Sequence, residues 1–403
     1  MLSISSMYSG YLDSFYKKYP DQGELSYEEH KKLLLDDTTE FVGAYLKNFR
    51  KLGIEADCVI CNDSKLQEKW GNERGISSDR QQDILIDQVT AFLPDVILVE
   101  NLSYVTSALL RSIRQKLPGL RMITANHCSP FNSKVLDSLK EVDFVFTCTP
   151  GLKSSIAVLG KKSYLVYHGF DTSLFERLNH DKGSPSNDFI FSGSLITGGD
   201  FHARRIKLIE HILKEQIDIR LYVNLEQSYR IRAKQAIYIL SEAVKKLKLE
   251  RTFSKFQILQ YGKTWVNSYS DSLIMHKEPP VFGDDMLNLF HNAKIVLNFH
   301  IGVAGDFAGN MRMFEVTGMG SCLLTDNKKN MSDLFDTENE VVVYDNEEDC
   351  IEKVKWLLAH EDERKKIALA GQQKTINYHT VENRCRSIIG IMNSELNHSG
   401  PVK

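Results

Sequence analysis

The segment Asn310–Asp326, which reads NMRMFEVTGMGSCLLTD, has residue types that could bind a phosphate group. Its periodicity predicts a helix over residues 310–317, and the first turn of a helix offers backbone N–H groups and a partial positive charge. Gly302, Gly305 and Gly309 precede this helix, and glycine lets the backbone approach a ligand closely. The segment therefore predicts a phosphate cradle. The glycines do not match the pattern GxxxxGK[ST], so an ATPase P-loop is not indicated.

Glu315 lies one to two turns into the predicted helix, between Phe314 and Val316. A carboxylate among apolar neighbours costs energy unless it is paired or accepts hydrogen bonds. The two hydroxyl groups of a ribose would satisfy it. An ion pair with Arg312, three residues earlier on the same helix, would also satisfy it. Spacing alone leaves both interpretations open.

A second group of cations follows a short apolar strand that reads FSGSL and contains Gly193. A Thr-Gly-Gly turn comes next. The helix after the turn begins with four cationic or titratable residues, His202, Arg204, Arg205 and Lys207. Cations beside a glycine turn suit the diphosphate of a leaving nucleotide. The alternative is a solvated helix face.

In the first half of the chain, His127 is the best candidate for a general base or an acceptor-binding group. It follows the strand-like run MITAN and precedes a Ser-Pro turn. We therefore expect its ring to point into a cleft and to titrate near neutral pH. The alternative is a histidine that only caps the turn. His168, in the sequence HGFD, is a weaker candidate, with Asp171 as a helix cap.

These residues need a scaffold, and the sequence predicts an α/β one. Short apolar runs alternate with amphipathic helical stretches, which is typical of parallel sheets covered by helices on both faces. In the first half we expect strands at residues 56–60, 96–99, 122–125, 144–147 and 164–167. In the second half we expect strands at residues 189–193, 219–223, 256–261, 295–299, 322–325 and 341–343.

Residues 179–187 read NHDKGSPSN, a run of turn formers that we interpret as a linker. The chain has 403 residues, which favours two domains. We place an N-terminal Rossmann-like domain at residues 1–178 and a C-terminal one at residues 188–379. Ligands in open α/β sheets bind beyond the carboxyl ends of the strands, so we expect the chemistry in a cleft between the two domains.

The composition limits the classes of binding partner and the cellular location that we expect. The formal net charge of -3 does not suggest a nucleic acid. No signal peptide or membrane span is recognisable, so we expect a cytoplasmic location, with contact to the inner membrane surface left open. Seven dispersed cysteines fit a reducing compartment. Cys58 and Cys61 form a CxxC, but no second ligand pair follows at zinc spacing. We expect a structural role for them and no bound metal.

The second half of the chain resembles the C-terminal domain of group 1, family 4-like glycosyltransferases of the GT-B fold. It is similar above all to the branch of CgeB-like spore-maturation proteins and bacterial cell-surface sugar transferases. The resemblance rests on blocks that run in order from Phe191 to Gln372: FSGSL…H..R, YG, VFGDDM, AKIVLNFH, NMRMFE…G.G..LLTD, EVVVYD and LLAHEDERKKIALAGQ. The first half is similar more loosely, through SGYLDSFY, PDV, NHCSP and HGFD.

The resemblance implies two Rossmann-like domains facing across a cleft, the C-terminal one holding a nucleotide-sugar. The last helix, with residues 380–403, would return to the first domain. Arg205 and Arg312 would neutralise the diphosphate, His127 would be the candidate base, and Glu315 would bind the ribose. The full set of donor-binding residues would be Gly10, Gly193, His202, Arg205, Tyr261, Gly262, Lys263, Val281, Phe282, Asn310, Met311, Arg312 and Glu315.

The implied activity is metal-independent, retaining hexosyl transfer without a cofactor, from a UDP- or GDP-sugar to a saccharide, lipid-linked or protein acceptor in cell-surface polysaccharide biosynthesis. Many retaining members carry two glutamates eight positions apart. Glu315 matches the second, but Phe307 stands at the first, next to Asp306. A UDP-sugar epimerase and a non-catalytic nucleotide-sugar-binding protein are the alternatives, because one fold hosts several functions. The sugar, the base, the acceptor and the oligomeric state stay open.

Overall fold

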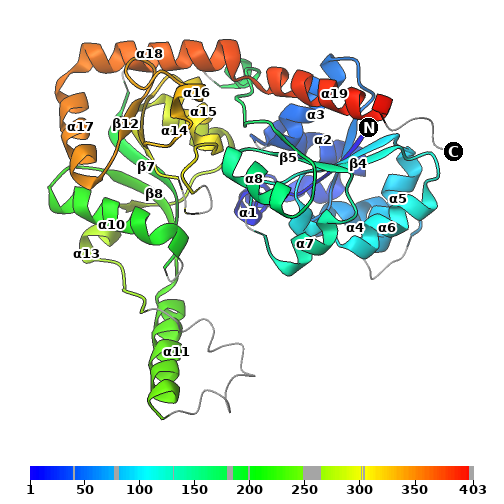
Figure 1. The fold of residues 1–403 in the computed structure, drawn as a ribbon, viewed down its shortest axis with the longest axis horizontal. Coiled ribbons are helices and arrows are strands. Elements are labelled where there is room, and N and C mark those ends of the chain that lie inside the picture. Colours follow the sequence, from blue (N-terminus) through cyan, green and yellow to red (C-terminus); the bar gives the residue numbers. More distant parts are fainter. Residues whose placement is uncertain are drawn as a thin grey trace.

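The structure is a computed structural model that describes residues 1–39, 41–76, 81–129, 131–178, 185–197, 200–247, 265–300, 302 and 305–398. Within these residues the chain forms two six-stranded sheets, each covered by helices on both faces (Figure 1). All the strand pairs are parallel, as their short apolar runs predict. The predicted α/β fold class is therefore confirmed. The proposed linker lies mostly outside the described residues, and the strand expected at residues 256–261 lies wholly outside them.

The first sheet has the strand order β2-β1-β3-β4-β5-β6. Its strands are β1 (Leu2–Ser5), β2 (Asp57–Ile60), β3 (Val96–Val99), β4 (Met122–Asn126), β5 (Phe144–Thr147) and β6 (Ser163–Leu165). Strand β1 was not predicted. It has only four residues, but it is buried and pairs with a strand on each side, so that Ser3 lies between Cys58 and Leu98.

The helices of the first domain pack into two cores, one on each face of the sheet. They are α1 (Ser9–Lys18), α2 (Tyr27–Asp37), α3 (Phe41–Lys51), α4 (Ser64–Glu73), α5 (Gln81–Phe92), α6 (Ser107–Lys116), α7 (Ser133–Leu139) and α8 (Pro150–Val158), with short 3-10 turns at Pro20–Glu24 and Leu102–Tyr104. Helix α2 begins with a capping box of Ser26 and Glu29, which satisfies backbone N–H groups that have no partner within the helix.

The second sheet has the strand order β12-β11-β10-β7-β8-β9. Its strands are β7 (Asn187–Leu195), β8 (Arg220–Leu225), β9 (Lys277–Glu278), β10 (Ala293–Asn298), β11 (Cys322–Asp326) and β12 (Val342–Tyr344). Numbered within the domain, this order is 3-2-1-4-5-6, the order of the dinucleotide-binding fold. The order reverses between β7 and β10, and such a switch point is where open α/β sheets bind their ligands.

Helices α9 (Leu174–Arg177), α10 (Asp200–Lys214), α11 (Ser228–Lys246), α13 (Asp271–Met275), α14 (Gly283–His291), α15 (Met311–Gly318), α16 (Met331–Leu334), α17 (Glu347–Ala359) and α18 (Glu361–Tyr378) complete this half of the chain. Helix α11 extends away from the body of the molecule (Figure 1). None of the helices in the described ranges is long and apolar enough to span a bilayer.

The chain crosses between the domains twice at one place. After α18, helix α19 (Val381–His398) returns to the first domain, packs on α3, and contributes Cys385, Ile388 and Met392 to its core (Figure 1). The two crossings are paired, because Phe170 donates its N–H to the carbonyl of His379 at 2.8 Å and accepts from Val381 at 2.9 Å. The predicted return of the last helix is confirmed.

Candidate donor-binding site

Arg205 lies at the switch point of the second sheet. Its guanidinium donates from Nη1 to the carbonyl of Ser194 at 3.0 Å and from Nη2 to the carbonyl of Phe299 at 2.6 Å. These two carbonyls are at the carboxyl ends of β7 and β10, so helix α10 and both strands are tied together. An added Cβ at Gly193 would lie in ordinary contact with Nη1, at 3.6 Å, and closer to Cζ of Phe191, at 3.2 Å. The guanidinium also lies over the ring of Phe191, 5.3 Å from its centroid.

Arg205 is buried, and no carboxylate in the described part of the chain forms an ion pair with it. Burial and, to a smaller extent, the charge of Arg312 together lower its pKa to about 10, against an opposing effect of Asp326. Within the described residues Arg205 therefore lacks the carboxylate partner that Arg312 has in Glu315. A buried cation without such a partner favours an anionic ligand.

The start of α15 adds to this positive field. Asn310 is the N-cap residue, but its side chain does not cap the helix. It donates instead to Oδ1 of Asn298 at 2.7 Å, which ties the helix start to the end of β10. The first turn, with Met311 and Arg312, therefore has no side-chain cap, and a helix N-terminus of this kind attracts negative charge.

Glu315 and Arg312 form the ion pair that was the alternative to ribose binding, at 3.0 Å between Oε2 and Nη1. Arg312 also lies over the ring of Phe290, 4.6 Å from its centroid, and donates to Sδ of Met286 at 2.9 Å. The carboxylate is 13% exposed in its side chain. The pair orients both groups at the same end of the sheet as Arg205, and the ribose role of Glu315 stays a prediction.

Sequence reasoning missed a histidine–aspartate pair beside these cations. The Nδ1–H of His300 donates to Oδ1 of Asp326 at 2.7 Å, and its backbone N–H donates to the same oxygen at 2.9 Å. Although burial opposes it, the contacts with His300 and the charge of Lys328 hold the pKa of Asp326 below its usual range. The side chain of His300 is fully buried, and its Nε2 has no partner in the described part of the chain.

A signal for this pair was present in the sequence. Asp326 is the last residue of β11, and His300 follows β10 by two positions. Polar residues just beyond the carboxyl ends of adjacent parallel strands meet at one edge of the sheet. The rule that ligands bind beyond the carboxyl ends of parallel strands would have found His300 and Asp326.

Two predicted donor residues meet across the domain interface. Gly10 is in the first turn of α1, not in a loop as expected, because the helix begins at Ser9. An added Cβ at Gly10 would lie 2.9 Å from Cζ of Phe282. Phe282 packs against the core of the first domain, whereas Val281 packs in the core of the second. This segment is therefore a contact between the domains in the structure.

An ion pair strengthens the same contact. Arg177 pairs with Asp284 at the start of α14, and it also donates to the carbonyl of Thr38 at 3.3 Å. Asp284 lies in the first turn of α14. Three predicted donor residues, Tyr261, Gly262 and Lys263, lie outside the described residues, as does the side chain of His202.

Phe307 stands at the position where many retaining members carry the first glutamate, and its ring packs against the first domain. Phe307 approaches the first turn of α8, where an added Cβ at Gly151 would lie 2.8 Å from its ring. Its neighbour Asp306 is exposed and pairs with Lys329 at 2.7 Å. Asp306 therefore does not substitute for the absent carboxylate.

The expected orientation of His127 is wrong. Its ring is 1% exposed and packs on Phe131, with the centroids 5.0 Å apart. Neither ring nitrogen makes a well-formed hydrogen bond within the described part of the chain. Burial lowers its pKa to about 4, against a smaller effect of the Ser129 backbone, so it does not titrate near neutral pH. The run MITAN continues as strand through Asn126, which places the next side chain in the interior.

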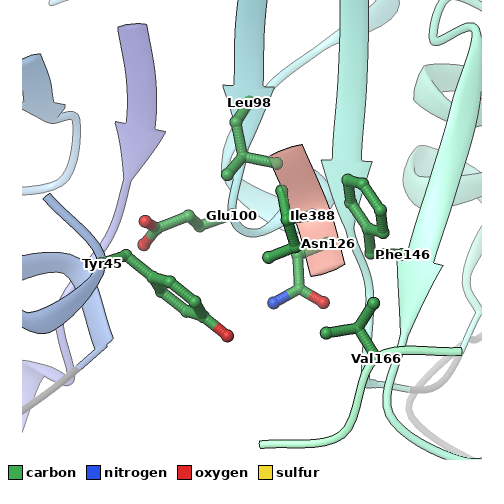
Figure 2. Close-up of a pocket in the computed structure, with 7 residues that line it drawn as sticks. All are labelled: Tyr45, Leu98, Glu100, Asn126, Phe146, Val166 and Ile388. Carbon is green, nitrogen blue, oxygen red and sulfur yellow. The ribbon is translucent and has the colours of Figure 1, made fainter. Parts of the chain in front are cut away.

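A small cavity of the first domain contains a buried acid (Figure 2). Glu100 follows β3 at the switch point of the first sheet, and its backbone N–H donates to the carbonyl of Ile4 at 2.9 Å. The cavity is lined by Tyr45, Leu98, Glu100, Asn126, Phe146, Val166 and Ile388. Burial raises the pKa of Glu100 to about 7, which the Ser5 side chain partly offsets. Sequence reasoning did not single out this residue.

Comparison with known proteins agrees with this architecture. Residues 235–390 match a protein family described as glycosyl transferase-like. No functionally curated protein matches the sequence. Several solved structures align with almost the whole chain.

A glycosyltransferase from Rickettsia africae is 12% identical, with 97% of this chain and 96% of that chain aligned and a TM-score of 0.52. Anabaena HepE, solved in complex with UDP-glucose, is 11% identical over 98% and 99% of the two chains, with a TM-score of 0.57. Sucrose-phosphate synthase from Thermosynechococcus elongatus is 8% identical over 89% and 93%, with a TM-score of 0.54. At these identities the likeness shows the fold, which is GT-B. The family match lies within residues 235–390, and the structural alignments extend over both domains.

Proposed function

We propose that the chain transfers a sugar from a nucleotide-sugar, bound at the switch point of the second sheet, to an acceptor bound by the first domain. One observation carries the donor half of the proposal. Arg205 is buried at this switch point with no carboxylate partner among the described residues, in the electrostatic field of the cation Arg312 and at the same sheet edge as the uncapped start of α15. A diphosphate would supply the negative charge that this group of residues attracts.

The same residues would act on the leaving group. As the bond from the sugar to the diphosphate breaks, negative charge grows on the phosphate oxygens. Preformed donors that point at developing charge lower the barrier, typically by ~3–4 kcal/mol for one group. Arg205 is held by two carbonyls, so it would need little reorganisation to do this.

We further propose that the transfer is retaining and does not need a metal ion at the diphosphate. The cations and the helix start would perform the neutralisation that a metal performs elsewhere. A retaining reaction can let the leaving phosphate take the proton of the acceptor, so it needs no separate base. The burial of His127 agrees with a reaction that does not use it.

The acceptor class follows from the sequence resemblance to CgeB-like and cell-surface sugar transferases, which favours a saccharide or lipid-linked acceptor in a bacterial cytoplasm. A feature of the fold supports contact with an anionic membrane surface. Helix α11 exposes the apolar residues Ile239 and Leu240, at 60% and 54%, together with the cations Arg232 and Lys246. Exposed apolar and basic side chains on one helix are typical of interfacial binding. Sedimentation with phosphatidylglycerol vesicles, compared with phosphatidylcholine vesicles, tests this contact.

The donor proposal is tested by thermal stabilisation with UDP-, GDP-, dTDP- and CDP-linked sugars. A ligand that binds only the folded state raises the Tm as its concentration exceeds its Kd. We expect one nucleotide class to stabilise the wild type and to stabilise Arg205→Ala much less. Arg111→Ala, which removes an exposed ion pair of the first domain, is the control. Equal stabilisation of all three proteins would contradict the proposed donor site.

A further inference from the structure

Three adjacent strands of the first sheet end beside potential metal ligands. Cys128 follows β4, Cys148 follows β5 and His168 follows β6. These strands are neighbours in the order β4-β5-β6, so their carboxyl ends lie at one edge. The two sulfur atoms and a ring nitrogen of the histidine all lie within 4.8 Å of one another. Residues 20 positions apart along the chain are therefore gathered at one point by the topology.

The surroundings hold these side chains in place. The ring of His168 stacks on Phe41, with the centroids 4.7 Å apart and the planes 15° apart, and its backbone carbonyl accepts from Nε of Arg384 at 2.9 Å. Cys128 Sγ donates to Oδ1 of Asn126 at 3.6 Å. Cys148 is buried beside Cys128 and His168. A thiolate is the form of cysteine that binds metals.

Two cysteines and a histidine form a ligand set for zinc. Zinc bonds to sulfur at ~2.3 Å and to nitrogen at ~2.0 Å in a tetrahedron, so its ligand atoms lie roughly 3.3–3.8 Å apart. The observed separations need side-chain movements of only about 1 Å to reach this geometry. Three protein ligands leave one position for a water molecule or another ligand.

We propose that Cys128, Cys148 and His168 bind a zinc ion at the edge of the first domain. The inference does not depend on the proposed transfer, because the site is in the other domain from Arg205 and Arg312. It also differs from the expectation that the chain binds no metal, which considered only ligands close together in sequence. The CxxC pair has the structural role that we expected. Cys58 packs in the core on one face of the sheet, and Cys61 packs against the core on the other.

The location gives the ion a mechanical consequence. An added Cβ at Gly309, in the loop before α15, would overlap the carbonyl oxygen of Cys148. At Gly169, next to His168, an added Cβ would lie 2.8 Å from the carbonyl carbon of Thr380 at the crossing between the domains. A zinc ion would therefore hold three strand ends in place at the surface where the two domains are in contact.

The test uses the full chain after removal of metal with a chelator. Cobalt(II) is titrated as a probe, because thiolate coordination gives a charge-transfer band in the near ultraviolet. We expect the band to saturate at one cobalt per chain, to disappear when zinc is added, and to be accompanied by a rise in Tm. Cys128→Ser, Cys148→Ser and His168→Ala should each weaken binding more than ~tenfold.

The double variant Cys58→Ser/Cys61→Ser is the matched control, and it should bind cobalt as the wild type does. The wild-type titration is decisive even if a variant folds poorly, and circular dichroism checks the fold of each variant. The absence of a charge-transfer band in the reduced wild type would overturn the proposal. It would equally fail if Cys148→Ser bound cobalt with unchanged affinity, or if thiol titration of the protein as purified showed Cys128 and Cys148 joined in a disulfide.

Discussion

Arg312 and Glu315 are joined by a 3.0 Å ion pair on one face of α15, directly after the uncapped start of that helix. The pair has two consequences that can be separated. If it only stabilises the helix, its loss costs little, because partly exposed pairs of this spacing contribute about 0.3–0.5 kcal/mol. If the carboxylate also binds a ribose, its loss weakens the donor.

For Glu315→Gln we therefore expect a small change in Tm and a rise of about tenfold or more in the KM for the nucleotide-sugar, since a hydrogen bond to a charged group contributes ~1.5–3 kcal/mol. The measurement is steady-state kinetics at varied donor concentration. Glu382→Gln, which removes ion pairs on α19, is the control. An unchanged KM in Glu315→Gln would reduce Glu315 to a structural role.

Arg205→Ala should depress kcat by about a hundredfold or more, because one preformed donor at developing charge typically contributes this much. Arg205→Lys should recover part of the loss, since it keeps the charge but cannot bridge the carbonyls of Ser194 and Phe299. Both variants should also unfold at lower temperature, as buried carbonyls lose their donors. The check is single-turnover transfer with Tm measured in parallel, and full activity in Arg205→Ala would refute the role.

Glu100 should make the free energy of unfolding depend on pH. Its folded pKa of about 7 is above its ordinary value of 4.5, so the neutral form is favoured in the folded state. The stabilisation is complete below about pH 4.5 and is lost as the pH rises toward 7. The full change is on the order of 3 kcal/mol, since a tenfold change in protonation corresponds to about 1.4 kcal/mol. Urea unfolding from pH 4.5 to 8 should show a flatter profile in Glu100→Gln than in the wild type.

His127 should give the free energy of unfolding a pH dependence of the opposite sign. Its pKa is lowered from 6.5 to about 4, so its contribution is present above about pH 6.5 and is lost as the pH falls toward 4. We expect His127→Gln to flatten the acid limb of the unfolding profile while leaving the pH dependence of kcat unchanged. A shift of the kinetic profile in this variant would restore His127 as a base.

Gly309→Ala should separate the domains locally. The new methyl group would overlap the carbonyl of Cys148, which is backbone and cannot rotate away. Overpacking of this kind costs about 1–3 kcal/mol, and the loop that leads into α15 would shift, so donor affinity should fall with Tm. Gly390→Ala, where nothing lies within 4 Å of the added Cβ, is the matched control and should be neutral or slightly stabilising. Equal Tm values for the two variants would contradict this packing.

Much of the fold was predictable because its signals are local. The strands at Val96–Val99 and Phe144–Thr147 were found at the bounds that the sequence pattern indicated. Strand β1 was missed because a four-residue run of alternating small polar and apolar residues looks the same exposed or buried. Only its two neighbouring strands, far away in sequence, make it part of the sheet.

The candidate site was predictable in part for a related reason. The position of Arg205 followed from a cation that comes after a strand and a turn, which is a local pattern. The pairing of His300 with Asp326 could have been expected from their places at the carboxyl ends of adjacent strands. The burial of His127 depends on which side chains pack around it, and one sequence does not contain that information. Cys128, Cys148 and His168 also follow adjacent strands, but the sequence does not show how close their side chains lie.

The paired crossing at Phe170 and Val381 limits how the two halves can move. Two backbone segments that lie side by side act as a hinge. They allow rotation about their shared axis and resist translation along it. Opening to admit a donor would therefore be a swing about this line. The contact of Phe282 with Gly10, which joins the two domains, would have to open in such a swing, whereas the residues beside this line would hardly move.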